Sequence, residues 1–103
     1  MLRITINESD AAIAMTLEGR VAGPWVNELS QAWSEISPRL GRRTVSLDLC
    51  NVTYADAGGK KLLSNIYEQS NAKLVTNNLW AQYIADQISK SSKNQENGHG
   101  NNA

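Results

Sequence analysis

The chain has 103 residues, 41% of them hydrophobic, and its ten Lys and Arg residues are balanced by ten Asp and Glu residues. This length fits one small domain with a single core, and the zero net charge disfavours nucleic-acid binding. No apolar run reaches the ~20 residues that cross a bilayer, the first residues lack a secretion signal, and the single Cys excludes an internal disulfide. We therefore expect a soluble, cytoplasmic protein that does not insert into a membrane.

The first half of the chain predicts a β-hairpin followed by a helix. Apolar and polar residues alternate over 2–6 and again over 13–17, with a turn-forming segment between them, as in two strands that each bury one face. Gly19 ends the second alternation, and Gly23-Pro24 precedes an apolar stripe of helical period over 25–36.

The second half predicts the order strand, helix, strand, helix. Residues 45–49 alternate as a third strand, Gly58-Gly59 begins a second helix, and 72–76 form a short fourth strand. Asn77 or Asn78 caps a third helix, whose expected apolar face consists of Leu79, Trp80, Tyr83, Ile84 and Ile88. The resulting order, β-β-α-β-α-β-α, predicts an α/β fold in which helices pack on a mixed sheet whose later strands are parallel.

The composition changes at Ser89. From there to Ala103 the sequence reads SKSSKNQENGHGNNA, which has no apolar residue before the final Ala and cannot offset the entropy of ordering. We therefore place one domain at 1–88 and a polar, disordered tail at 89–103. His99 lies in this tail without a Cys or a second His nearby, so we expect it to bind no metal and to serve in no catalysis.

The most informative segment is LDLCNVTYADAGG, at positions 47–59, where a strand leads into a short loop and then into a helix. This order places Asp56 at the carboxyl end of the sheet, an edge that α/β folds often use for function. Asp56 can cap the helix or accept a hydrogen bond from a partner. The glycines that follow can turn the chain or admit another molecule close to the backbone.

The pattern D-L-x-x-V-T-Y-x-D-x-G-G in this segment resembles the signature of STAS domains, and Leu17-Glu18-Gly19-Arg20 resembles the L-x-G-x segment of that family. The resemblance covers about 2–88 and agrees with the expected order of elements, and it implies a sheet with the helices packed on one side. It implies a bacterial anti-sigma-factor antagonist that regulates transcription through protein–protein interaction, without catalysis or a cofactor. The implied partner is an anti-sigma factor, a serine kinase with the histidine-kinase-like ATPase fold.

One position departs from the family pattern in a way that matters for regulation. In typical antagonists the motif reads D-S-S-G-L, and phosphorylation of its first Ser breaks the complex with the kinase. Here Asp56 and Gly59 match the motif, Ala57 stands at the phosphorylated position, Gly58 replaces the second Ser and Lys60 replaces the Leu. Because Ala57 cannot be phosphorylated, the partner is bound constitutively, or regulation lies elsewhere, or the partner is not a kinase.

Two other functions stay open at this point. Small STAS subunits that regulate the ATPase of lipid-transporting ABC systems carry a similar D-x-G-G motif, usually with Thr where this chain has Ala57. A nucleotide-binding domain is a further alternative, because a glycine pair stands at the start of a helix. Thr53 and Ser64 are hydroxyls near the motif, although neither occupies the position of the phosphorylated Ser.

The docking surface that we predict consists of residues 56–60, flanked by the loop 19–25. Gly23 and Trp25 belong to that loop, and an exposed Trp25 would anchor a partner. Lys60 and Lys61 are either solvated or in contact with an acidic or phosphate-bearing partner.

The remaining chemistry-bearing residues have structural explanations. Trp33 and Trp80 fall on helix stripes and are expected in the core, and Cys50 is expected to be a small buried residue at a strand end. No catalytic or metal-binding arrangement emerges, and we expect no enzyme.

Overall fold

The computed structural model describes the backbone of residues 1–102 and the side chains of residues 1–90. The elements follow the predicted order and confirm the α/β fold class. In chain order they are β1 (Leu2–Glu8), β2 (Ala12–Val21), α1 (Pro24–Ile36) with a 3₁₀ turn at Ser37–Arg39, β3 (Thr44–Ala55), α2 (Ala57–Ser70), β4 (Lys73–Val75) and α3 (Leu79–Asn102).

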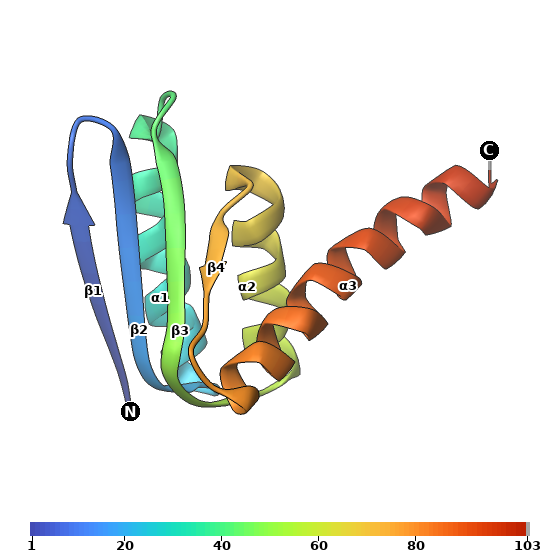
Figure 1. Ribbon diagram of the computed structural model, residues 1–103, viewed down its shortest axis with the longest axis horizontal. Coiled ribbons are helices and arrows are strands. Elements are labelled where there is room, and N and C mark those ends of the chain that lie inside the picture. The colour runs from blue at the N-terminus through green and yellow to red at the C-terminus, as the bar shows by residue number, and fades with distance from the viewer. Residues whose placement is uncertain (103) are drawn as a thin grey trace.

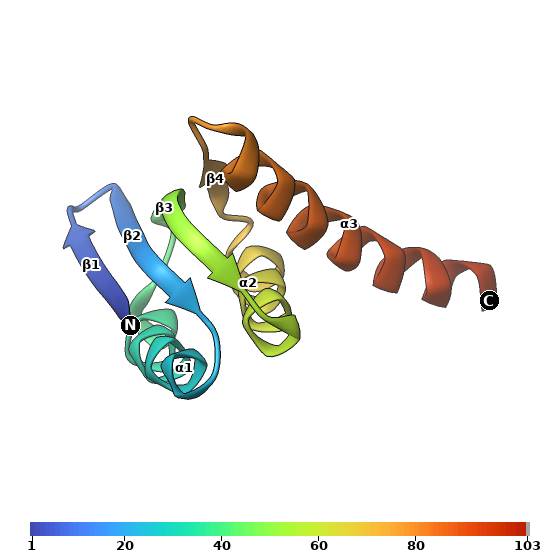
Figure 2. The same cartoon turned by 90° about the horizontal axis from the view of Figure 1, so that it is seen from below.

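The four strands form one mixed sheet in the order β1-β2-β3-β4. β1 and β2 are antiparallel, as expected of a hairpin, whereas β2–β3 and β3–β4 are parallel because a helix connects the strands of each pair. Figure 1 shows that the β2–α1 and β3–α2 connections and the start of α3 lie at the same end of the sheet. Figure 2 shows α1 and α2 together on one face of the sheet.

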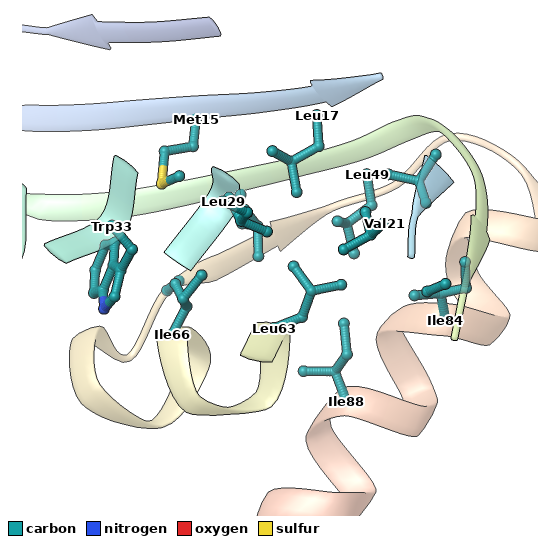
Figure 3. Close-up of a cluster of buried hydrophobic side chains, with 14 of the residues drawn as sticks. Met15, Leu17, Val21, Leu29, Trp33, Leu49, Leu63, Ile66, Ile84 and Ile88 are labelled. Carbon is teal, nitrogen blue, oxygen red and sulfur yellow. The ribbon is translucent and has the colours of Figure 1, made fainter. Parts of the chain in front are cut away.

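The core lies between this face of the sheet and the helices. Met15 and Leu17 from β2 and Leu49 from β3 are fully buried and point toward the helix layer (Figure 3). The opposing side chains come from all three helices, and those shown buried in the same figure are Leu29, Trp33, Leu63, Ile66, Ile84 and Ile88. Trp33 is in the core as predicted, and its indole Nε1 donates to Gln69 Oε1 at 2.8 Å.

β3 is longer than the sequence predicts, because two bulges interrupt its alternation. Its inward residues are spaced by two up to Leu49 and then by three, at Val52 and Ala55. The register with β2 shifts at the same two places. A bulge adds one residue to a strand without ending the pairing, so the prediction of a loop after Leu49 is wrong.

β2 is also longer than predicted. The alternation continues from Leu17 through Gly19 to Val21, with Gly19 in an inward position. Because glycine has no side chain, the apolar pattern has a gap there, and this gap reads as the end of a strand. The prediction that Gly19 ends the strand is therefore wrong.

The apolar face predicted for α3 is only partly right. Among the side chains of this helix up to residue 90, the buried ones are Ala81, Ile84, Ala85 and Ile88, which follow a helical period. Leu79, Trp80 and Tyr83 are exposed by 90%, 43% and 50%, so the expectation that Trp80 belongs to the core is wrong. The two alanines belong to the buried face. The prediction included the larger hydrophobic residues Leu79, Trp80 and Tyr83 instead, and these lie on the solvent side.

The domain boundary predicted at residue 88 falls within α3. Ile88 is fully buried, while the backbone of the helix continues to Asn102. The side chains from residue 91 onward lie outside the described residues, so the disordered tail at 89–103 stays a prediction.

The assignment of the two faces of α3 can be tested by a matched pair of substitutions. Ile84→Ala should lower the free energy of unfolding by about 2–5 kcal/mol, because it leaves a cavity in the core. Leu79→Ala removes a side chain from the exposed side of the same helix and should change it by less than about 0.5 kcal/mol. Urea denaturation of both variants measures the difference, and similar losses would contradict the assignment.

Candidate functional site

Asp56 joins the two loops at the carboxyl end of the central strands. Its Oδ1 accepts the Gly59 N–H at 2.7 Å and caps α2, and its Oδ2 accepts the Gly23 N–H at 2.9 Å. The Asp56 N–H donates to the Val21 carbonyl at 3.2 Å. The sequence predicts the cap, but the bond to Gly23 joins residues 33 positions apart and emerges only in the fold. We refer to these contacts as the Asp56 junction.

The junction also sets the protonation of its carboxylate. The N–H of Gly23 and then that of Gly59 stabilise the charged form and lower the pKa of Asp56 below its ordinary value of 3.8, against a smaller opposing effect of burial. Asp56 is therefore an anion at neutral pH, with both oxygens already bonded to backbone amides. This arrangement lets the Asp56 carboxylate hold the two loops together and place a negative charge between them. It leaves the carboxylate little capacity for proton transfer.

Gly59 is buried, and the backbone that approaches it closely is that of Val21 in the same chain, not that of another molecule. A Cβ built there would collide with the Val21 carbonyl oxygen, so only glycine lets α2 approach the end of β2 this closely. Gly58 differs, because it is exposed and a Cβ would meet nothing closer than Asp56 Oδ1 at 3.7 Å. Of the glycine pair, Gly58 is the residue that leaves room at the surface.

The other predicted site residues gather around the junction with unequal exposure. Ala57 and Gly23 are exposed, and Lys60 is half-buried at the first turn of α2. Gly23 has a φ of 56°, in the region that favours glycine, and directly precedes Pro24 of α1. Trp25 is half-buried and packs against the core, so only part of its side chain is available to a partner.

The two hydroxyls near the motif lie in different environments. Ser64 is 4% exposed and its Oγ donates to the Ile88 carbonyl at 2.9 Å, which ties α2 to α3. Thr53 is exposed in the second bulge of β3. Ser64 is thus inaccessible in the folded chain, whereas Thr53 is open to solvent.

A group of exposed large hydrophobic side chains at the end of β3 and the start of α3, which we call the aromatic surface, was missed by the sequence reasoning. It consists of Tyr54, Leu79, Trp80 and Tyr83, and the rings of Trp80 and Tyr83 stack with centroids 5.6 Å apart. The guanidinium of Arg20 lies over the Tyr54 ring at 4.8 Å. The missed signal was the helical spacing of Ala81, Ile84, Ala85 and Ile88, which assigns Leu79, Trp80 and Tyr83 to the solvent side of α3.

A shallow hollow of about 540 Å³ adjoins this aromatic surface, and its lining residues are Cys50, Asn51, Val52, Thr53, Asn78 and Trp80. Asn78 shapes it by donating from Nδ2 to the Cys50 carbonyl at 2.9 Å and accepting the Ala81 N–H at 2.8 Å, which caps α3. Asn78 is therefore the cap that the sequence left open between two asparagines. The hollow combines apolar and polar walls, as protein interfaces commonly do.

Cys50 lies within β3 and is half-buried, which corrects the expectation of a buried residue at a strand end. The neighbouring Asp48 carboxylate, followed by burial, raises the pKa of the Cys50 thiol, and Asp48 Oδ1 accepts the Cys50 N–H at 2.9 Å. A thiol held in its neutral form is a poor nucleophile.

Among the described side chains, no three His, Cys, Asp or Glu residues converge as metal ligands. Within the described part of the chain, no helix combines the length and the apolar character needed to span a membrane. Comparison of the chain with protein-family models and with curated proteins finds no match.

The role of Gly59 can be tested against its neighbour. Gly59→Ala should lower the free energy of unfolding by about 3 kcal/mol, because the new methyl group forces α2 away from the end of β2. Gly58→Ala adds the same methyl group one residue earlier, in open space, and should stabilise the helix by up to about 1 kcal/mol. Thermal or urea denaturation gives both values, and equal effects would show that the close contact has no energetic consequence.

The acid response of the junction gives a second test. Because the pKa of Asp56 is lower in the folded chain than its ordinary 3.8, this carboxylate stabilises the fold above about that pH, and the stabilisation is lost as pH falls through the folded-state pKa. Asp56→Asn should melt lower at pH 7, and the gap to the wild type should narrow as the pH falls below 4. Glu8 is present in both proteins and cancels in the comparison. A gap that does not change with pH would contradict the role of the charge.

Proposed function

We propose that the chain is a STAS-domain regulatory protein of the anti-sigma-factor antagonist type, which acts by binding a partner and not by catalysis. The proposed partner is an anti-sigma factor and serine kinase with the histidine-kinase-like ATPase fold. The observation that carries the proposal is the Asp56 junction, where the residues that match the family motif meet the β2–α1 loop at one end of the sheet.

The proposed docking surface extends from the junction to the aromatic surface. Ala57 and Gly58 offer small, exposed backbone positions that a partner can approach closely. Exposed Trp and Tyr side chains are the residue types that most often contribute binding energy at interfaces. Trp80 and Tyr83 belong to the first turns of α3, which begins at the same end of the sheet as the junction (Figure 1). The proposed docking surface therefore combines a polar region at the Asp56 junction, which would orient the partner, with aromatic side chains that would contribute binding energy.

Under the proposal, Ala57 keeps the docking surface permanently in its unphosphorylated state. A phosphate would add about −1.5 to −2 charge next to the Asp56 carboxylate, and two neighbouring negative charges repel. Without a hydroxyl at position 57 this change cannot occur, and Ser64 is too buried to replace it. The partner would then be bound constitutively, unless a modification acts at an exposed hydroxyl such as that of Thr53.

A regulatory subunit of an ABC-transporter ATPase remains the second candidate, favoured by the D-x-G-G form of the motif. It would use the same end of the domain and would itself stay outside the bilayer. A nucleotide-binding function has less support, because the Asp56 carboxylate already occupies the N–H of Gly59 and places a negative charge where a phosphate would bind.

The proposal is tested by capturing partners from native lysate with the wild type and with Ala57→Asp, followed by mass spectrometry. The wild type should recover a histidine-kinase-like ATPase, and the variant should lose it because a buried, unpaired charge disfavours the interface. With the purified partner, calorimetric titration should show at least about a tenfold weaker affinity for Ala57→Asp, equivalent to ~1.4 kcal/mol.

Matched controls separate the possible explanations of that result. Gln31→Asp places the same charge on an exposed position of α1 and should bind like the wild type. Trp80→Ala should also weaken the complex if the aromatic surface takes part. Recovery of an ABC ATPase would select the second candidate, and unchanged affinity of Ala57→Asp would place the interface elsewhere.

A further inference from the structure

The open edge of the sheet at β1 carries unpaired backbone groups. In the described part of the chain, β1 is an edge strand that pairs with β2 alone (Figures 1 and 2). The Arg20 N–H donates to the Met1 carbonyl at 3.0 Å, and in an antiparallel ladder such bonded pairs recur at every second residue. The N–H and C=O groups of Arg3, Thr5 and Asn7 therefore face β2, whereas those of the residues between them face the open edge.

Ile4 and Ile6, whose backbone N–H and C=O groups face the open edge, also have apolar side chains. Ile4 and Ile6 point toward the helix face of the sheet and pack against the core, yet both remain half-buried. Natural edge strands are usually protected from pairing by a proline, a bulge or an inward-pointing charge. Residues 4–7 have none of these, and β1 pairs with β2 without a register shift. Glu8 shares the inward parity of Ile4 and Ile6, but it lies at the end of the strand and its charge is paired with Arg39 and Arg43.

We propose that two copies of this chain pair through β1 and form one continuous antiparallel sheet. The two-fold axis would pass through Thr5 and stand perpendicular to the sheet. In this register each residue lies opposite its counterpart on the other side of Thr5, so the backbone groups of Ile4 in one copy bond those of Ile6 in the other. The strand then pairs over its whole length.

The sequence of β1 is complementary to itself in this register. Ile4 lies against Ile6 on the helix face, and Thr5 lies against its own copy on the open face, both of which are favourable cross-strand pairs. Arg3 lies opposite Asn7, so no like charges oppose each other. Because this register gives the inner residues of β1 compatible partners in a second copy, we assign the edge to that copy and not to an unrelated peptide.

The carboxyl-terminal end of β1 is fixed by side-chain hydrogen bonds. Glu8 Oε1 accepts hydrogen bonds from Arg39 at 2.8 Å and from Arg43 at 3.1 Å, which fix the strand end to the segment that follows α1. A strand that is already ordered loses less conformational entropy when it pairs. The dimer does not depend on the proposed function, because β2 separates β1 from the strand that carries the Asp56 junction.

A site-specific crosslink tests the register. In the Cys50→Ala background, Thr5→Cys places two thiols opposite each other in a non-hydrogen-bonded pair, with Cα atoms about 4.5 Å apart, within the range that a disulfide spans. Asn7→Cys is the matched control, since it lies on the same exposed face but roughly 13 Å from its own copy. Under mild oxidation Thr5→Cys should form the covalent dimer much faster. Equal rates, or faster crosslinking of Asn7→Cys, would overturn the proposed register.

Light scattering on a sizing column tests the dimer itself. The wild type should show twice the monomer mass of 11.3 kDa at concentrations near 100 µM, where a dimer with a dissociation constant of about 1 µM is almost fully formed. Thr5→Lys places like charges at the axis and should raise that constant at least about tenfold, while Gln31→Lys adds the same charge on α1 and should not. A monomeric wild type, or a dilution series in which Trp80→Ala raises the dissociation constant and Thr5→Lys does not, would overturn the proposal.

Discussion

The candidate site depends on one carboxylate that bonds two backbone amides from separate loops. Parallel strands bring their carboxyl ends to one edge of a sheet, but they do not by themselves fix the loops that follow. Asp56 does so by accepting the N–H groups of Gly23 and Gly59 while its own N–H bonds the Val21 carbonyl. The close approach of Gly59 to Val21 completes the contact. The positions of Ala57 and Gly58 at the surface follow from these bonds.

The bulges of β3 determine what stands beside the junction. Each bulge adds a residue that does not pair with β2, and the strand twists so that Thr53 and Tyr54 are exposed while Val52 and Ala55 stay inward. The amides and carbonyls disturbed there find side-chain partners: Asp48 accepts the Cys50 N–H and Asn78 donates to the Cys50 carbonyl. Asn78 also caps α3. The residue that bonds the Cys50 carbonyl in the bulge therefore also fixes the start of α3, which carries Trp80 and Tyr83, beside the bulge.

The sequence was sufficient for the order of elements and for the cap of α2, because both depend on local patterns. Alternation and helical period identified the four strands and three α-helices of the described chain, although not their full lengths, and the Asp before the glycines indicated the capping contact. What sequence reasoning missed depends on longer-range contacts or on changes of period. The bond from Gly23 to Asp56 requires the packed sheet, and the spacing of three residues after Leu49 reads as a loop unless a bulge is assumed. The exposure of Trp80 followed from small residues, Ala81 and Ala85, which carry a weaker hydrophobic signal than an indole.

The two proposals together constrain how the protein would engage its partner. A two-fold axis perpendicular to the sheet makes the strands of the two copies run in opposite directions, so their carboxyl ends point to opposite ends of the dimer. The docking surfaces at the two Asp56 junctions would therefore face away from each other. One compact partner could not reach both surfaces, and the avidity that comes from two contacts with a single molecule would be lost. The dimer would instead bridge two separate partner molecules, each bound to the docking surface of one copy.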